Sequence, residues 1–156
     1  MGTIAIDDRI PTHVFRFVER ELYDYRVNKE LCMEYLQRRN DELTKGRQAP
    51  ESIKVNGELV LSDASGIIGA SNPVQGKTLR LLALEQRAER ALFYVRAIDS
   101  TLRTLSDEER KLVTRKYFDA DVTNDSLALE LAMGRTRFYE VREGVVRKFA
   151  IRFALL

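Results

Sequence analysis

The chain has 156 residues, the length of one ordinary domain or of a small domain with an extended arm. Its net charge of +2 excludes a polycation, so any nucleic-acid surface must come from local clustering of charge. The single cysteine and single histidine exclude an internal disulfide and cannot supply the usual ligands of a zinc site. Because no long apolar run is present, we expect no membrane span and no secretory signal. No cofactor is expected either.

The first predicted helix runs from Thr12 to about Thr44 and carries a heptad-like apolar stripe with two charged lapses. Cys32 falls on this stripe, so we expect it to be a buried structural thiol. His13 lies near the helix start and is expected to be a surface or capping residue. The stripe consists of Phe15, Leu22, Lys29, Leu36 and Leu43, with Val18, Tyr25, Cys32 and Arg39 at the intervening places.

Residues 45–72 interrupt the helical pattern with four glycines and a proline. Within them, Asn56-Gly57 lies between two short β-prone runs. Asn-Gly supplies the two positive φ angles of a tight hairpin turn, so a small β-hairpin is predicted inside this loop.

The stretch GASNPVQGKT, residues 69–78, ends like a phosphate-binding P-loop. Ser71, however, stands where that motif has its first glycine, and Pro73 has no N–H to offer a phosphate. Asn72-Pro73 is better interpreted as a helix start, with Asn as the cap and Pro at the first helical position.

A second long helix is predicted from Pro73 to about Thr104, with an apolar seam typical of a coiled coil. Its partner is either the first helix folded back or the same helix of a second chain. Two series at seven-residue spacing form the seam: Leu81, Ala88, Val95 and Leu102, and Leu84, Ala91, Ile98 and Leu105.

Three shorter helices are predicted in residues 106–150. Ser106 and Glu109 form a capping box at the start of the first, which runs through Tyr117. The polar break 119–125 matches a calcium-binding loop only in part, because Asn124 replaces the glycine that makes its sharp turn. A short helix over about 124–133 follows.

The last two helices have the pattern of a helix-turn-helix unit, in which Gly134 takes the bend and Thr136 caps the final helix. From Gly134 to the end, six basic and two acidic residues give a charge of +4, whereas residues 105–133 carry a charge of −3. Positive charge is therefore concentrated on the candidate recognition helix, whose N-terminal end would enter a major groove. The predicted DNA-binding residues are Arg135, Thr136, Arg137, Tyr139, Glu140, Arg142, Arg147 and Lys116.

The motifs LSDEERKLVTRKYF and LALELAMGRTRFYEVREGVVRKFA, separated by a polar spacer, resemble the C-terminal part of sigma factor region four. They resemble more closely the phage transcriptional regulators of the RinA and ArpU type, and this resemblance covers roughly residues 73–150. It implies a phage- or prophage-encoded, DNA-binding activator of late genes for packaging and morphogenesis. Such a protein would act in the bacterial cytoplasm, on promoter or operator DNA and with host RNA polymerase as a further partner.

The sequence thus predicts an all-α fold of two segments. Residues 1–104 would form a coiled-coil-like stem with a loop and hairpin at 45–72, and residues 105–156 would form the helix-turn-helix module. The apolar C-terminus needs a cover, so a homo-oligomer, most simply a dimer, is expected. Two alternatives stay open, namely a small terminase subunit that serves DNA packaging and a coiled-coil assembly protein that binds no DNA. An enzyme is not expected, since no carboxylate pair, metal set or nucleophile motif is visible.

Overall fold

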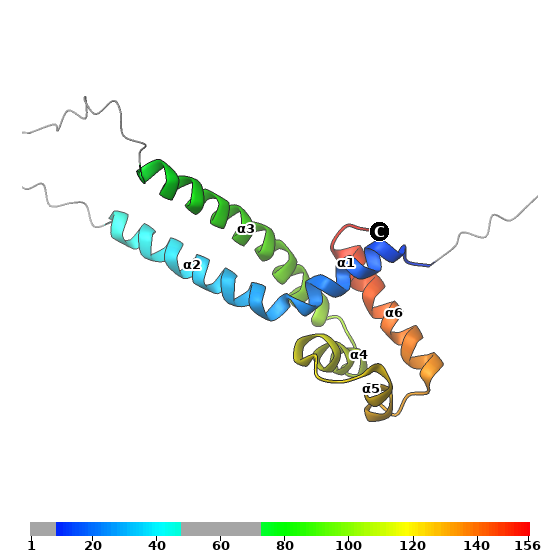
Figure 1. Cartoon of the computed structure of the whole chain (residues 1–156). Coiled ribbons are helices and arrows are strands. Elements are labelled where there is room, and N and C mark those ends of the chain that lie inside the picture. Colours follow the sequence, from blue (N-terminus) through cyan, green and yellow to red (C-terminus); the bar gives the residue numbers. More distant parts are fainter. Residues whose placement is uncertain (1–8, 48–72) are drawn as a thin grey trace, which may run out of the picture.

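The computed structural model describes residues 9–47 and 73–156, and in these residues the chain forms helices and no strands (Figure 1). The predicted all-α class is therefore confirmed for the described part of the chain. The hairpin predicted around Asn56-Gly57 lies outside the described residues. The elements in order are α1 (Thr12–Tyr23), α2 (Tyr25–Arg47), α3 (Pro73–Leu102), α4 (Asp107–Val113), the π-helical turn η1 (Thr114–Asp119), α5 (Asn124–Glu130) and α6 (Arg135–Arg152).

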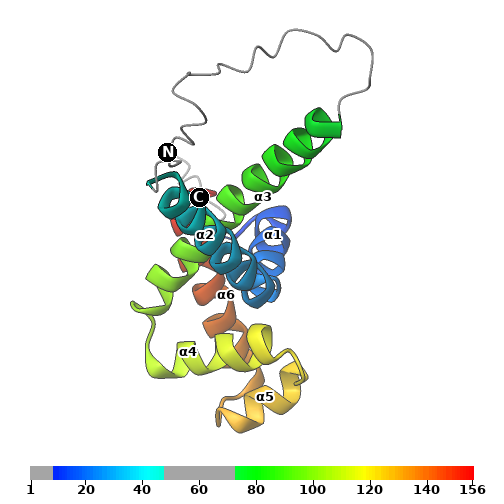
Figure 2. The same ribbon diagram turned by 90° about the vertical axis from the view of Figure 1, so that its left-hand side faces the viewer.

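Helices α2 and α3 lie side by side and antiparallel, and they project as a helical hairpin from the rest of the molecule (Figures 1 and 2). The long helices thus pair within one chain. Helix α3 begins at Pro73, as predicted. Its seam is covered only near the base of the hairpin, where Ala88 and Val95 are buried, whereas Leu81 is 56% exposed.

Cys32 is buried at the base of the hairpin, as predicted, and its Sγ lies 3.7 Å from the carbonyl oxygen of Ala88. Burial raises the pKa of this thiol, and the nearby Arg96 opposes that rise only in part. A buried thiol with a raised pKa is a poor nucleophile, in agreement with a structural role.

The prediction of one helix from Thr12 to Thr44 is wrong at Asp24, where α1 ends before α2 begins at Tyr25. The two parts of the apolar stripe have different partners, because α1 contacts α6 and η1 while α2 contacts α3. Val18 and Leu22 are accordingly buried in the base, and Cys32 is buried in the hairpin. Because the helix is interrupted at Asp24, the two parts of the apolar stripe can pack against these two different surfaces.

The capping box of α4 is confirmed. The amide of Glu109 donates to Ser106 Oγ at 3.2 Å, and the amide of Ser106 donates to Glu109 Oε2 at 2.9 Å. The predicted continuation through Tyr117 differs, since the α-helix gives way at Thr114 to the π-helical turn η1. This turn holds Tyr117 in the core at 1% exposure and ends at Asp119, and the next residue, Ala120, has a left-handed φ of 52°.

The turn between α5 and α6 differs from the prediction in two ways. Ala132, with a φ of 53°, adopts the left-handed conformation, whereas Gly134 has an ordinary φ of −64°. Gly134 therefore does not take the bend. It occupies the N-cap position of α6, which begins at Arg135, so Thr136 is not the cap. Helix α5 ends at Glu130, shorter than the predicted span to Met133.

One hydrophobic core holds together the helices at the base of the molecule. Its largest fully buried side chains include Leu22 of α1, Ile98 of α3, Tyr117 of η1, and Phe138 and Phe149 of α6. The two predicted segments, 1–104 and 105–156, thus share a core. No helix in the described residues is long and apolar enough to cross a membrane.

Candidate nucleic-acid interface

The first turns of α6 carry an exposed group of side chains that we call the α6 tip: Arg135, Thr136, Arg137 and Tyr139. Helical periodicity explains the exposure, because Phe138 and Val145 lie inward and are almost fully buried. The tip is at the end of the molecule away from the free ends of the α2–α3 hairpin (Figures 1 and 2).

The tip is electropositive for two local reasons. The first turn of α6 carries no acidic residue, and Gly134 provides no side-chain cap for the free backbone N–H groups. A helix N-terminus bears a partial positive charge, to which the guanidinium groups of Arg135 and Arg137 add. Such a surface suits an anionic ligand such as the phosphate backbone of DNA.

Two carboxylates moderate this charge. Arg137 lies 3.6 Å from Glu108 of α4, in an ion pair whose side chains are 65% and 44% exposed. Glu140, which the sequence also placed in the site, is exposed one turn along α6. An exposed ion pair contributes little stability, so a phosphate could replace Glu108 at Arg137 with little loss.

Arg142, also predicted to bind DNA, lies in an internal cluster beside the tip, with its guanidinium carbon 6.0 Å from the ring centroid of Tyr139. Its guanidinium donates to Glu19 of α1 and, at 3.4 Å, to the hydroxyl of Tyr117, and it stacks over the ring of Phe15. Burial would lower the pKa of Arg142, but the hydrogen bonds to Glu19 and Tyr117 outweigh it and raise the pKa. The pKa of Tyr117 is raised by burial and by the charge of Glu19. This cluster fastens α6 to α1.

The two remaining predicted residues, Lys116 and Arg147, are also only partly exposed. Lys116 Nζ donates to Asn124 Oδ1 at 2.7 Å, at the start of α5. Burial lowers the pKa of Lys116, and the neighbouring Arg142 lowers it further. Arg147 interacts within the chain. The structure thus brings together Arg135, Thr136, Arg137, Tyr139 and Glu140 as exposed side chains, whereas Lys116, Arg142 and Arg147 are only partly exposed.

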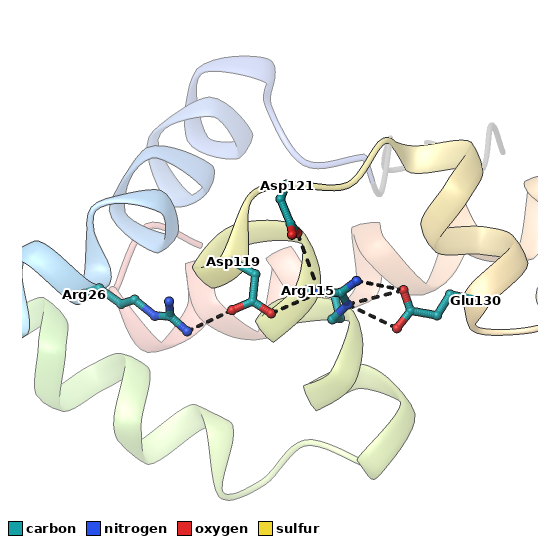
Figure 3. A network of polar contacts seen from close by, with 5 residues as sticks. All are labelled: Arg26, Arg115, Asp119, Asp121 and Glu130. Carbon is teal, nitrogen blue, oxygen red and sulfur yellow. Dashed lines mark hydrogen bonds and ion pairs between the residues drawn. The ribbon is translucent and has the colours of Figure 1, made fainter.

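An ion-pair network that the sequence did not reveal positions α5 (Figure 3). Arg115 of η1 lies among three carboxylates, with its nitrogens 3.1 Å from Glu130, 3.3 Å from Asp119 and 3.6 Å from Asp121. Arg26 of α2 joins it through Asp119 at 2.9 Å. The only local signal for this network was the four-residue spacing of Arg115 and Asp119.

The same network includes carboxylates of the partial calcium-loop match at the polar break. Asp119 and Asp121 of this break, together with Glu130 at the twelfth position counted from Asp119, are partners of Arg115. In the residues that the structure describes, no three His, Cys, Asp or Glu side chains come together to hold a metal ion.

A second contact fixes α6 against α4. Lys148 Nζ lies 2.7 Å from Glu109 Oε1, next to the capping box. Burial acts to raise the pKa of Glu109, but the Lys148 ammonium and the Ser106 amide stabilise the carboxylate and lower its pKa overall. Helix α6 is therefore held by its apolar face, by Glu19 and by Glu109, while its tip is left exposed.

Comparison of the chain with protein-family models, with curated proteins and with solved structures finds no match.

Proposed function

We propose that this protein binds double-stranded DNA by placing the α6 tip in a major groove. The observation that carries the proposal is the exposure of Arg135, Thr136, Arg137 and Tyr139 on adjacent turns of a helix that the core holds in place. Arginine can donate two hydrogen bonds to guanine, and threonine and tyrosine can bond phosphates or base edges. The short turn from α5 to α6 is compatible with a helix-turn-helix unit.

The internal contacts of α6 support this use of its N-terminus. Base readout requires side chains held on a rigid element, and α6 is fixed by Phe138, by the Arg142–Glu19 pair and by the Lys148–Glu109 pair. Arg142 and Lys116 would then act by positioning α6 and α5 rather than by touching DNA.

The test is a titration of DNA fragments at several salt concentrations with wild-type protein and Arg135→Ala/Arg137→Ala. We expect the wild type to bind one fragment preferentially, and the variant to lose roughly tenfold or more in affinity with a shallower salt dependence. The matched control is Arg80→Ala/Arg87→Ala, which removes two exposed arginines of α3, far from the tip. Equal losses in both variants, or no binding at low salt, would refute the proposal.

A second variant tests the tip in the opposite direction. Glu108→Gln removes the carboxylate that faces Arg137 and one negative charge beside the phosphates. We expect it to raise DNA affinity by roughly three- to tenfold at low salt, and the gain should shrink at high salt because screening weakens exposed charges. An unchanged affinity would mean that Arg137 does not face the DNA.

The biological role that we propose follows from the resemblance of residues 73–150 to RinA- and ArpU-type regulators. The protein would act in the cytoplasm of a bacterial host as a sequence-specific transcriptional regulator, most simply an activator of phage late genes. Transcription in vitro with host RNA polymerase, from a template carrying the preferred fragment, tests activation. No change in transcript level would leave DNA binding without this regulatory role.

A coiled-coil assembly protein that binds no DNA is the second candidate. The apolar side chains exposed on the α2–α3 hairpin favour it, because a hairpin with uncovered leucines is suited to association. It predicts no salt-dependent DNA binding. A small terminase subunit would also bind DNA, and a ring of many subunits would distinguish it from a regulatory dimer.

A further inference from the structure

We infer that a groove along the α2–α3 hairpin binds the same groove of a second copy of this chain, and that the two hairpins lie parallel about a two-fold axis. The groove, which we call the stem groove, lies between the two helices. Its lining residues are Tyr35, Arg38, Arg39, Glu42 and Leu43 of α2 and Leu81, Leu84, Glu85 and Glu89 of α3.

The floor of the stem groove is apolar and uncovered. Leu43 is 61% exposed and Leu81 is 56% exposed, with Leu84 beside them. Leu81 and Leu84 continue the heptad series that is buried further down α3, at Ala88 and Ala91. Among the residues that the structure describes, none covers this face toward the free end of the hairpin, as expected of a surface for association.

The rims of the groove carry opposite charge. Arg38 and Arg39 outnumber Glu42 on the α2 side, whereas the α3 side carries Glu85 and Glu89. Among the residues that the structure describes, neither these arginines nor Glu85 and Glu89 take part in an ion pair with their own chain. These four charged side chains beside an apolar floor thus have no ion-pair partner in the described part of their own chain, and a second chain can supply partners for them.

This arrangement selects a second copy as the occupant and fixes its orientation. A two-fold axis along the hairpin places α2 of each chain opposite α3 of the other, with both hairpins pointing the same way. Counted from the contact between Cys32 and Ala88, Arg38 and Arg39 of each copy then lie within about one turn of Glu85 of its partner, and Glu89 lies about one turn further toward the base. A two-fold interface must be complementary to itself, and a groove with one basic and one acidic rim meets that condition.

The orientation has a consequence that rests on the proposed function. The α6 tip lies at the end of the molecule away from the free ends of α2 and α3 (Figures 1 and 2). Parallel hairpins would place both tips at the same end of the dimer, where one DNA duplex could meet them together. An antiparallel pairing would separate the tips by the length of the molecule.

The test uses two charge-reversed full-length chains. Arg38→Glu/Arg39→Glu makes both rims acidic, and Glu85→Arg/Glu89→Arg makes the α3 rim basic like the α2 rim. In homodimers of either variant, like charges face each other, so the dissociation constant should rise by roughly tenfold or more. Mixing the two variants places acidic rims against basic rims at both contacts and should restore a dimer. The four-fold variant that exchanges both rims in one chain should also dimerise.

Light scattering after size exclusion, without DNA, reads out the mass against the 18.0 kDa of one chain. The control is Glu30→Arg/Glu34→Arg, two exposed reversals on α2 outside the groove, which should leave the mass unchanged. Should a double variant lose helicity in circular dichroism, the single changes Arg38→Glu and Glu85→Arg give the same mixing test.

A wild-type dimer, monomeric variants and a dimer on mixing would together support the stem groove as the interface. A monomeric wild type, dimerisation that both reversals leave intact, or variants that stay apart on mixing would overturn it. Because the readout contains no DNA, failure of this interface leaves the proposed DNA binding untouched, and failure of DNA binding leaves this interface standing.

Discussion

Arg135 and Arg142 are seven residues apart on α6, and the sequence alone predicts that both bind DNA. Seven residues are about two helical turns, so both side chains start from nearly the same face. Yet Arg135 is exposed, whereas Arg142 is only 16% exposed because Glu19 of α1 covers and pairs with it. The difference is made by a residue 123 positions away in the chain. Its cause is a tertiary contact, which local pattern and charge could not reveal.

The first prediction concerns this pair. Glu19→Ala leaves the largely buried Arg142 guanidinium without its carboxylate and removes the acceptor of the Tyr117 hydroxyl. Breaking a buried ion pair from one side is costly, so we expect the free energy of unfolding to fall by about 3 kcal/mol. Urea denaturation followed by circular dichroism measures this change.

The double variant Glu19→Ala/Arg142→Met separates pairing from mere packing. With both charges gone, an apolar side chain can fill the site, and most of the lost stability should return. A Glu19→Ala variant within about 0.5 kcal/mol of the wild type would mean that the pair is solvated and contributes little. If the double variant still binds DNA as the wild type does, Arg142 does not belong to the DNA-binding surface.

At the scale of the elements, features that depend on neighbours within a few residues were predicted from the sequence. The capping box at Ser106 and the start of α3 at Pro73 both occur where the sequence placed them. The break at Asp24 and the π-helical turn after Val113 were not predicted. Neither is marked by glycine or proline. The break lets α1 and α2 pack on different partners, and the π-helical turn buries Tyr117. Tertiary packing overrode a continuous local pattern at these places.

The second prediction tests the α5–α6 turn. Ala132 has a left-handed φ of 53°, so Ala132→Gly should relieve about 1 kcal/mol of backbone strain. Part of this gain is offset because glycine gives the unfolded chain more conformational freedom. We expect a net stabilisation of about 0.5 kcal/mol. Thermal and urea unfolding of this variant beside Gly134→Ala provide the measurement.

Gly134→Ala serves as the matched comparison. Its φ is −64°, and an added Cβ would meet nothing within 4 Å. The stiffer unfolded chain favours alanine and the N-cap position favours glycine, so these effects nearly cancel and the change should stay within about 0.5 kcal/mol. If Gly134→Ala lowered the free energy of unfolding by more than about 1 kcal/mol, the turn between α5 and α6 would require glycine at position 134.

At the scale of the molecule, the described helices form a base with one core and a hairpin that projects from it (Figure 1). The positive charge of residues 134–156, against the negative charge of residues 105–133, predicted that α6 is the DNA-binding element. In the structure, the first turns of α6 carry exposed side chains. Sequence pattern shows which faces are apolar, but it does not show which faces meet, and here α1 and α3 both pack on α6.

The last prediction follows from this shared core. A fragment of residues 105–156 would lose α1 and α3, which both pack on α6, and it would leave Arg142 without Glu19. A chain of about 50 residues with a partial core is marginal, so the fragment should show weak helicity and no cooperative thermal transition. The full chain should unfold in one transition, and a fragment that restores α1 and α3 should regain it. A fragment 105–156 that melted cooperatively on its own would establish the boundary at residue 104 as a true domain boundary and make α1 an accessory to an independent module.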